Sequence, residues 1–413
     1  GQPPGGAGTA AVAVHGGSYA KIVYYPVGSS PGWAALDGAI TITTHNNIES
    51  IVDLSLATNL TVYGTSDEDT INIVDGGVVT HATNCPTGCQ TTSIQSAQFA
   101  SIKFANKTKV VVDGGDDDDT YTLNISQAAA GLRSLAVEDD SGTDSLTVGS
   151  FSAGVALSIT LEESGAGGDD RITAAGNALL QGESLSLSAV YVTVNAGITI
   201  STRQANVGGD SIGNSGNITM KAKVIAIKPG AQLLAHVEAG SGYQAGNITL
   251  GVSDTDWTGI AALDFFLEEI ITPWFGAFGV YINRARVEID GATLKGNDIA
   301  ITSNAQYTPD PALGGKVPFM DQYQWVDLLK GAAVLLFGTD LGLPFDFVVA
   351  IASAKVTVKG NTLIDAAGSI EIKSIAESDG SNEVLHDKFS IALGWASAEA
   401  KTSIEGTTTI SAG

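Results

Sequence analysis

The stretch Gly114-Gly-Asp-Asp-Asp-Asp119-Thr-Tyr-Thr is one of four acidic segments with a common spacing. In each segment an aspartate is followed two residues later by an apolar residue. These aspartates are Asp69, Asp119, Asp144 and Asp170, so the second and third steps are nearly equal and the first is twice as long. The spacing indicates a repeat with a period of about 25 residues and one doubled step. It predicts a further copy near Ile94, in a stretch interrupted by a cysteine loop.

Short apolar stretches stand beside these turns, and each predicts a strand. Alternation of apolar and polar residues indicates a half-buried strand, whereas the unbroken run of Val110, Val111 and Val112 predicts a strand buried on both faces. A strand, an acidic turn and another strand, repeated about every 25 residues, are typical of one coil of a β-solenoid. Stacked coils bury a continuous core and align their turns in a column. The stretches are residues 60–63, 110–112, 135–137 and 159–161.

The second half of the chain repeats a different pattern. Gly216-Asn-Ile-Thr-Met220 recurs as Gly246-Asn-Ile-Thr-Leu250. A longer unit, which begins Ala-Arg/Lys and contains Gly six residues later, starts at Ala285, Ala354 and Ala400. Leu294 and Leu363 match in the first two copies, which continue into strands at 299–301 and 370–372. The third copy stops before that continuation, which predicts a segment of a longer protein.

Two segments break the β pattern. Residues 258–272 and 321–337 carry apolar residues at helical spacing, and Pro273 and Gly338 follow them. We expect short helices in insertions near 255–280 and 318–347. Their many aromatic residues predict a cover over one solenoid face, an apolar docking surface for another subunit, or a contact with a membrane.

Composition restricts the partners. The 413 residues include 44 acidic and 20 basic side chains, for a net charge of −24, and 50 glycines that indicate many turns. Nucleic acid is excluded as a partner, because phosphate binding needs clustered Lys and Arg. No uninterrupted apolar run reaches the roughly 18 residues that a membrane-spanning helix needs, so no transmembrane helix is expected.

The acidic turns resemble the Ca²⁺-binding nonapeptide of RTX proteins, Gly-Gly-x-Gly-x-Asp-x-apolar-x. Gly114, Gly115, Asp119 and Tyr121 match this pattern, although Asp117 replaces the third glycine. The resemblance implies Ca²⁺ held by carboxylates. The alternative is a set of solvated turns whose carboxylates accept hydrogen bonds from local backbone N–H groups. The candidate ligands are Asp67, Asp69, Asp116, Asp117, Asp119, Asp144, Asp169 and Asp170.

The Ala-Lys/Arg-Val-x-Ile/Val-x-Gly units are similar to those of filamentous-haemagglutinin-like exoproteins and related giant bacterial surface proteins. This resemblance covers roughly residues 180–413 and implies a right-handed parallel β-helix, secretion to the cell surface, and a role in adhesion or biofilm. We therefore expect an all-β solenoid in two segments, 1–180 with acidic turns and 181–413 with helical insertions.

Cys85 and Cys89 are the two cysteines of the chain. Their spacing across Pro-Thr-Gly favours a local disulfide, with two free thiols and a metal site as alternatives.

The function expected from these features is that of an extracellular structural or adhesive repeat protein. Such a protein would self-associate into a fibre, matrix or stalk, with Ca²⁺ as a stabilising ion. No catalytic motif is present, since the five histidines are isolated and no Gly-x-Ser-x-Gly or Walker A sequence occurs. The alternatives are a β-helix polysaccharide lyase or epimerase, and a non-catalytic adhesin that binds surface glycans.

Overall fold

The computed structural model describes residues 10–14, 21–25, 39–43, 48–54, 56, 58–65, 67–82, 84–139, 141–161, 169–206, 209–254, 277–307, 345–378 and 391–413. Every helix or strand assigned in these residues is a β-strand, so the predicted all-β class is confirmed for them. The two expected helices, at 258–272 and 321–337, lie outside the described residues. The described ends of the two insertion ranges, 277–280 and 345–347, belong to strands.

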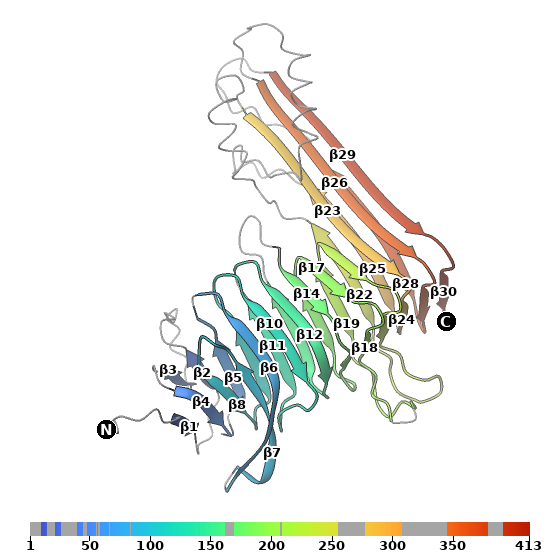
Figure 1. Cartoon of the computed structure of the whole chain (residues 1–413). Coiled ribbons are helices and arrows are strands. Elements are labelled where there is room, and N and C mark those ends of the chain that lie inside the picture. Colours follow the sequence, from blue (N-terminus) through green and yellow to red (C-terminus); the bar gives the residue numbers. More distant parts are fainter. Residues whose placement is uncertain are drawn as a thin grey trace.

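Two large sheets run along the molecule, and neighbouring strands in them are parallel except around β7 (Figure 1). The larger sheet has two columns after its first coils. The first column is β6 (Thr70–His81), β10 (Thr120–Ile125), β12 (Ser145–Ser152), β14 (Arg171–Ala174), β17 (Tyr191–Val194), β20 (Val224–Ile227), β23 (Ala277–Asp290), β26 (Phe345–Lys359) and β29 (Ile391–Ile404). The second column is β15 (Ala178–Leu179), β18 (Thr199–Ser201), β21 (Gln232–Leu234), β24 (Thr293–Gly296), β27 (Leu363–Ala366) and β30 (Thr409–Ala412).

The same sheet also contains β1 (Ala10–Val14), β4 (Ile48–Asp53), β7 (Cys85–Gln95) and β8 (Ser101–Phe104). The smaller sheet has one strand per coil. Its members are β2 (Lys21–Tyr25), β3 (Ala39–Thr43), β5 (Asn59–Tyr63), β9 (Lys109–Asp113), β11 (Ser134–Asp139), β13 (Ala156–Leu161), β16 (Leu185–Ser188), β19 (Ile218–Ala222), β22 (Ile248–Asp254), β25 (Ile299–Tyr307) and β28 (Ile370–Ser378).

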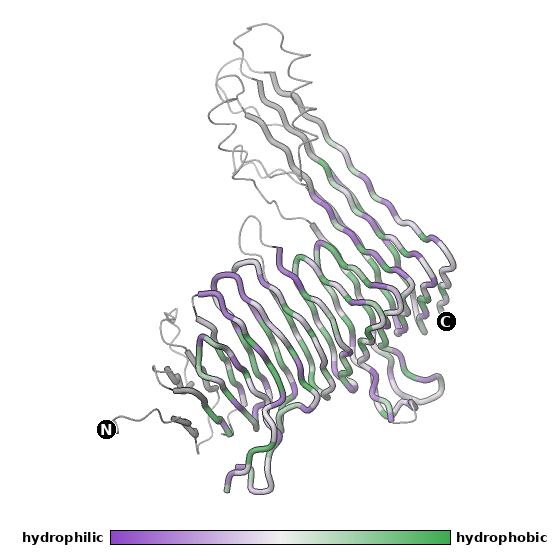
Figure 2. The backbone as a smooth tube through the Cα atoms, viewed as in Figure 1, coloured by the Kyte–Doolittle hydropathy of each residue, from purple (hydrophilic) through white to green (hydrophobic). Residues whose placement is uncertain are grey.

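The chain passes from one sheet to the other in every coil, and this forms a solenoid-like stack. Val192, Ile225 and Val287 show why the coils stay in register. They occupy matching positions in β17, β20 and β23, and all three are buried. Figure 2 shows hydrophobic positions recurring along successive coils. One core cluster extends from Ile51 to Ala366, and it crosses the predicted boundary at residue 180.

The doubled step between Asp69 and Asp119 is a single coil with a β-hairpin inserted in it. Strand β6 pairs directly with β10, so no coil lies between them. Ile94 lies in β7, antiparallel to β6 and opposite Ile73. The predicted further repeat copy near Ile94 is therefore wrong, because a hairpin strand and a coil strand have the same apolar alternation.

Two other expectations about strand residues need correction. In β9, Val110 and Val112 face the core but Val111 is only partly buried, so this strand is not buried on both faces. In β27, Ile364 rather than Leu363 pairs with Leu294 and is fully buried. The second repeat unit has one more residue in its corner than the first, and this shifts the core position by one.

The C-terminal coils have the longest strands. Strands β23, β26 and β29 continue well beyond the body of the stack (Figure 1). The repeat units beginning at Ala285, Ala354 and Ala400 are in register across these strands, as their sequences predict. Within the parts of the chain that the structure describes, no helix has the length and hydropathy of a membrane span.

Candidate functional site: a buried column of aspartates

The four repeated aspartates stack on one another at the start of β6, β10, β12 and β14. The backbone N–H of each earlier aspartate donates to the carboxylate of the next. The N–O distances are 2.7 Å from Asp69 to Asp119, 2.8 Å from Asp119 to Asp144 and 3.0 Å from Asp144 to Asp170. All four side chains are buried. The alignment made from spacing alone is therefore the true stacking alignment.

Backbone hydrogen bonds join the same positions in the opposite direction. Thr120, Ser145 and Arg171 each donate an N–H to the carbonyl of the aspartate one coil earlier, at 2.8–2.9 Å. Each pair of coils is thus connected twice at this corner, once through a carboxylate and once through a carbonyl. The carboxylates of Asp119, Asp144 and Asp170 bind backbone groups of the neighbouring coil, whereas the solvated-turn alternative placed these bonds within one turn.

The other four candidate ligands are exposed and lie outside the column. They are Asp67, Asp116, Asp117 and Asp169. Asp116 accepts a hydrogen bond from the Ser141 hydroxyl at 2.9 Å, and Asp169 forms a 3.3 Å ion pair with Arg171. Asp117 has a left-handed backbone with φ of 73°. The eight predicted residues therefore divide equally into a buried set and a solvated set.

Asp139, at the end of β11, joins the column although the prediction did not include it. It is buried, and its Oδ2 accepts a hydrogen bond from the hydroxyl of buried Tyr121. The signal for this position was present in β11, since Leu135, Val137 and Asp139 alternate on the inward side. That it meets Asp119 and Asp144 depends on the pairing of two sheets, which spacing within one segment does not reveal.

Gly114 makes room for this group. A Cβ atom at Gly114 would overlap Tyr121 Oη and Asp119 Oδ2, and it would lie 2.6 Å from Asp139 Oδ2. Three polar side chains thus converge on a position that only a glycine can occupy.

Some oxygens of this group have no hydrogen-bond donor. Asp119 Oδ2, Asp139 Oδ1 and Asp144 Oδ2 are buried without a hydrogen-bond partner. Asp69 differs, because the N–H and hydroxyl of Thr65 donate to its Oδ2 at 2.5 and 3.0 Å. The equivalent position before Asp119 is Gly115, which has no hydroxyl.

Burial makes the charged forms of these carboxyls unfavourable. Desolvation raises the pKa of Asp139 to about 9, and it raises the pKa values of Asp119 and Asp144 to about 7 and about 6. Mutual repulsion adds to this effect, and a proton on Asp139 would act in the opposite direction by letting it donate to Asp119 or Asp144. The group therefore needs positive charge in the form of a proton or a cation.

The fit to a cation is incomplete. The donor atoms are hard oxygens of the kind that Ca²⁺ prefers, and three of them lack partners. However, nowhere in the described ranges do three or more acidic, histidine or cysteine side chains gather in the arrangement of a metal site. Asp119, Asp139 and Asp144 would be the residues to hold an ion, and their side chains would have to turn toward it.

A second polar column follows in the C-terminal coils, at the start of the smaller sheet's strands. Asn247 N–H donates to Asn217 Oδ1 at 2.8 Å, Asp298 N–H to Asn247 Oδ1 at 3.1 Å, and Ser369 N–H to Asp298 Oδ1 at 2.8 Å. The recurring Gly-Asn-Ile-Thr sequence thus marks a stacked corner. Here the later coil donates to the earlier side chain, opposite to the aspartate column.

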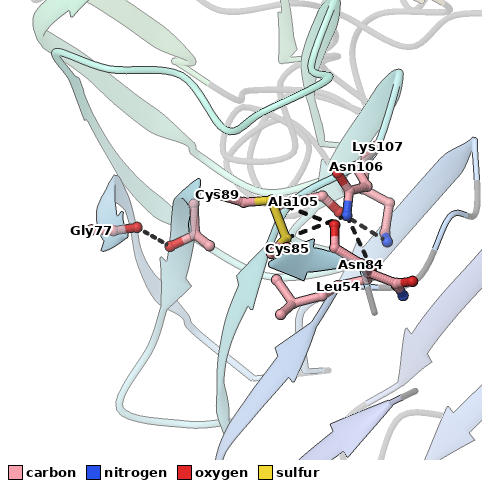
Figure 3. The surroundings of a disulfide bond; sticks show 9 residues. Leu54, Gly77, Asn84, Cys85, Cys89, Ala105, Asn106 and Lys107 are labelled. Carbon is pink, nitrogen blue, oxygen red and sulfur yellow. Dashed lines mark hydrogen bonds between the residues drawn. A yellow bond between two sulfur atoms is a disulfide. The ribbon is translucent and has the colours of Figure 1, made fainter. Parts of the chain in front are cut away.

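Cys85 and Cys89 form a disulfide in β7 (Figure 3). Cys85 is buried against Leu54 and Ala105, in a small cluster separate from the main core. Asn106 contacts the same cluster, since its amide donates to the Leu54 carbonyl at 3.1 Å and to Cys85 Sγ at 3.7 Å. The disulfide itself closes a short loop within β7, and its contacts with Leu54, Ala105 and Asn106 pack the inserted hairpin against the corner after β8.

The lyase alternative requires an accessible base beside carboxylates. Lys107 lies beside Asp53, but both side chains are fully buried and out of reach of a polymer. The partly exposed Lys359 lies 2.7 Å from Glu288 and 3.5 Å from Asp290. For glycan binding, Tyr243 is an exposed aromatic side chain among the described residues, at 42% of its surface. Most aromatic residues of the two insertions lie outside the described ranges.

Comparison with family models, curated proteins and solved structures finds no match for this chain. The resemblances to RTX and filamentous-haemagglutinin-like repeats therefore rest on the sequence patterns themselves.

Proposed function

We propose that this chain is an extracellular structural or adhesive repeat protein, a right-handed β-helix that associates with further copies of itself in a surface fibre, matrix or stalk. One observation carries the proposal. Ile404 and Ile410 in the last coil pair with Val358 and Ile364, which are fully buried. Yet Ile404 and Ile410 are 52% and 41% exposed. A coil stacked on β29 and β30, from a longer form of this chain or from a second copy, would cover these core positions.

The kind of partner follows from the way the coils already stack. A second β-coil would bury these isoleucines and pair with the free edges of β29 and β30, as every earlier coil does. If one end of a copy contacts a different surface of the next copy, the interface is heterologous. A series of such interfaces produces a filament unless the copies close into a ring. The disulfide supports the extracellular part of the proposal, since disulfides persist mainly in oxidising compartments.

The test compares the wild-type protein with the double variant Ile404→Lys/Ile410→Lys, by electron microscopy and light scattering at high concentration. We expect elongated multimers for the wild type and monomers for the variant, because lysine cannot be buried between coils. Val78→Lys is the matched control, since Val78 is 69% exposed on the inserted hairpin, and it should assemble like the wild type. Wild-type protein that remains monomeric at high concentration would contradict the proposal.

Calcium stabilisation is the second part of the proposal, and the partnerless oxygens of Asp119, Asp139 and Asp144 support it. An ion at these residues would replace the missing donors and offset their repulsion. We expect Ca²⁺ to raise the unfolding temperature relative to EDTA, and Asp139→Asn to abolish the difference. Asp298→Asn in the second column is the control and should respond like the wild type. Equal unfolding temperatures for the wild type with Ca²⁺ and EDTA would remove calcium from the proposal and leave assembly untouched.

A further inference from the structure

A lysine and an aspartate meet in a dry site near the disulfide. Lys107 Nζ lies 3.0 Å from Asp53 Oδ1, and both side chains are 0% exposed. Lys107 follows β8 and Asp53 ends β4, so the two residues belong to neighbouring coils. Nζ also donates to the carbonyl of Ala105 at 3.2 Å, which holds the amine in place. Figure 3 shows Lys107 with Ala105, Asn106 and the disulfide around it.

Other ion pairs of the described chain do not share this setting. The pairs Lys295–Asp365 and Lys355–Glu399 are at 3.5 and 3.2 Å, but each of their four side chains is 33% exposed or more. Water solvates such charges and keeps both groups ionised. Lys107 and Asp53 have no such solvation. Two opposite charges buried together cost desolvation free energy, which their attraction offsets only when the geometry is ideal.

Burial favours the uncharged form of the Lys107 amine. Desolvation lowers the pKa of Lys107, although the charge and hydrogen bond of Asp53 oppose this shift. Transfer of one proton along the existing hydrogen bond from Nζ to Oδ1 converts the ion pair into an amine and a carboxylic acid. These are the reactive partners for amide formation, and the 3.0 Å hydrogen bond to Oδ1 holds Nζ against the carboxyl group whose Cγ it would attack.

We propose that Lys107 and Asp53 join in an intramolecular amide bond between Nζ and Cγ. The lone pair of the neutral amine attacks Cγ of the protonated carboxyl, and the N–C bond forms. The C–O bond to the protonated oxygen then breaks, and that oxygen leaves as water with one proton from the amine. The reaction is a condensation without change of oxidation state, so it requires no additional reagent.

Such a bond would connect two neighbouring coils and would close a loop that contains the inserted hairpin. Cross-links of this length limit the unfolded chain and so stabilise the folded one. This inference does not depend on self-association or on Ca²⁺. It concerns the stability of the first coils toward unfolding and says nothing about the partners of the protein.

The test is the intact mass of the full chain, measured after denaturation. We expect a mass lower than that of the sequence by one water molecule and by the two hydrogens of the disulfide. Tryptic digestion after reduction should yield a branched peptide that contains both Lys107 and Asp53. A mass lower by the two hydrogens alone would overturn the proposal, as would separate linear peptides for the two residues.

Two controls make the result specific. Lys107→Arg keeps the positive charge but cannot form this amide, so its mass should show no loss of water. If this variant does not fold, the wild-type peptide map still decides the question. In the same digest, Lys295 and Asp365 should appear in unlinked peptides, because their ion pair is solvated.

Discussion

At the scale of single residues, Asp119 shows how one side chain performs two tasks with opposite requirements. Its Oδ1 accepts the N–H of Asp69, so the residue must present an acceptor. Its Oδ2 is buried without a donor, so its charge is a cost. An amide would keep the acceptor and remove the charge.

This argument predicts different effects for two substitutions at Asp119. In EDTA at neutral pH, Asp119→Ala should lower the free energy of unfolding by about 1–3 kcal/mol, because a buried N–H loses its acceptor. Asp119→Asn should be as stable as the wild type or more stable. Urea denaturation measures both, and Asp116→Ala, at an exposed position, should change stability by less than about 0.5 kcal/mol. If the asparagine variant is as unstable as the alanine variant, the charge rather than the acceptor is what matters.

His236 predicts an acid sensitivity of the C-terminal coils. Burial lowers its pKa to about 4, and the neighbouring charges of Arg203 and Lys295 add to the shift while Asp365 opposes it. The unfolded chain, with an ordinary histidine pKa near 6.5, binds the proton more readily than the folded one. The contribution of neutral His236 to stability is therefore complete above about pH 6.5 and falls as the pH drops toward 4.

The measurement is the urea midpoint of the wild type and of His236→Gln across this pH range. The variant should lose less stability on acidification, by a difference on the order of 1 kcal/mol, since His236 is partly solvated. Parallel curves for the two proteins would show that this histidine does not titrate differently on folding.

At the scale of elements, the corners between strands control how closely coils approach. Gly176, between β14 and β15, lies against the carbonyl of Gly149 in the previous coil, and a Cβ there would overlap that oxygen. Gly251, within β22, would place a Cβ 3.7 Å from Thr302 Oγ1, which is ordinary contact. Identical substitutions at these two glycines should therefore differ in effect.

We expect Gly176→Ala to lower the free energy of unfolding by about 2–3 kcal/mol, because two coils must separate to accept the methyl group. Gly251→Ala should be neutral or slightly stabilising, since alanine restricts the unfolded chain. Thermal unfolding of the two variants tests the contrast. Equal losses of stability in the two variants would mean that the corner contacts do not limit how closely neighbouring coils approach.

The elements also show what the sequence could and could not predict. The period of the acidic turns predicted the aspartate column correctly, because each coil repeats the same turn and register follows from the repeat. The hairpin of β6 and β7 was mistaken for an extra coil, since alternation does not reveal which strand is the partner. Asp139 was missed for a related reason, because its neighbours come from another sheet. Whether Leu363 or Ile364 faces the core depends on one extra corner residue.

At the scale of the whole molecule, stability is spread along one continuous core rather than concentrated in a centre. In such a stack each coil contacts its two neighbours, and terminal coils have one. Strand β30 illustrates the difference, because all of its residues are exposed, whereas Val192 and Val194 in β17 are buried.

Amide hydrogen exchange should follow this difference in burial between the middle and the last coils. Amides of β14, β17 and β20 in the middle of the stack should exchange most slowly, and those of β30 should exchange fastest among these strands. Mass spectrometry of exchanged peptides measures the order. Uniform protection from β14 to β30 in a monomeric sample would mean that the stack opens only as a single unit.

The two polar columns also bear on how a protein of this kind changes length over evolutionary time. In each column the donor and the acceptor of a hydrogen bond belong to adjacent coils, and the acceptors are aspartates in the first column and asparagine or aspartate in the second. A duplicated coil would therefore bring its own acceptor for one neighbour and its own donor for the other. Gene segments encoding whole coils could be gained or lost without compensating substitutions elsewhere, whereas fragments of a coil could not.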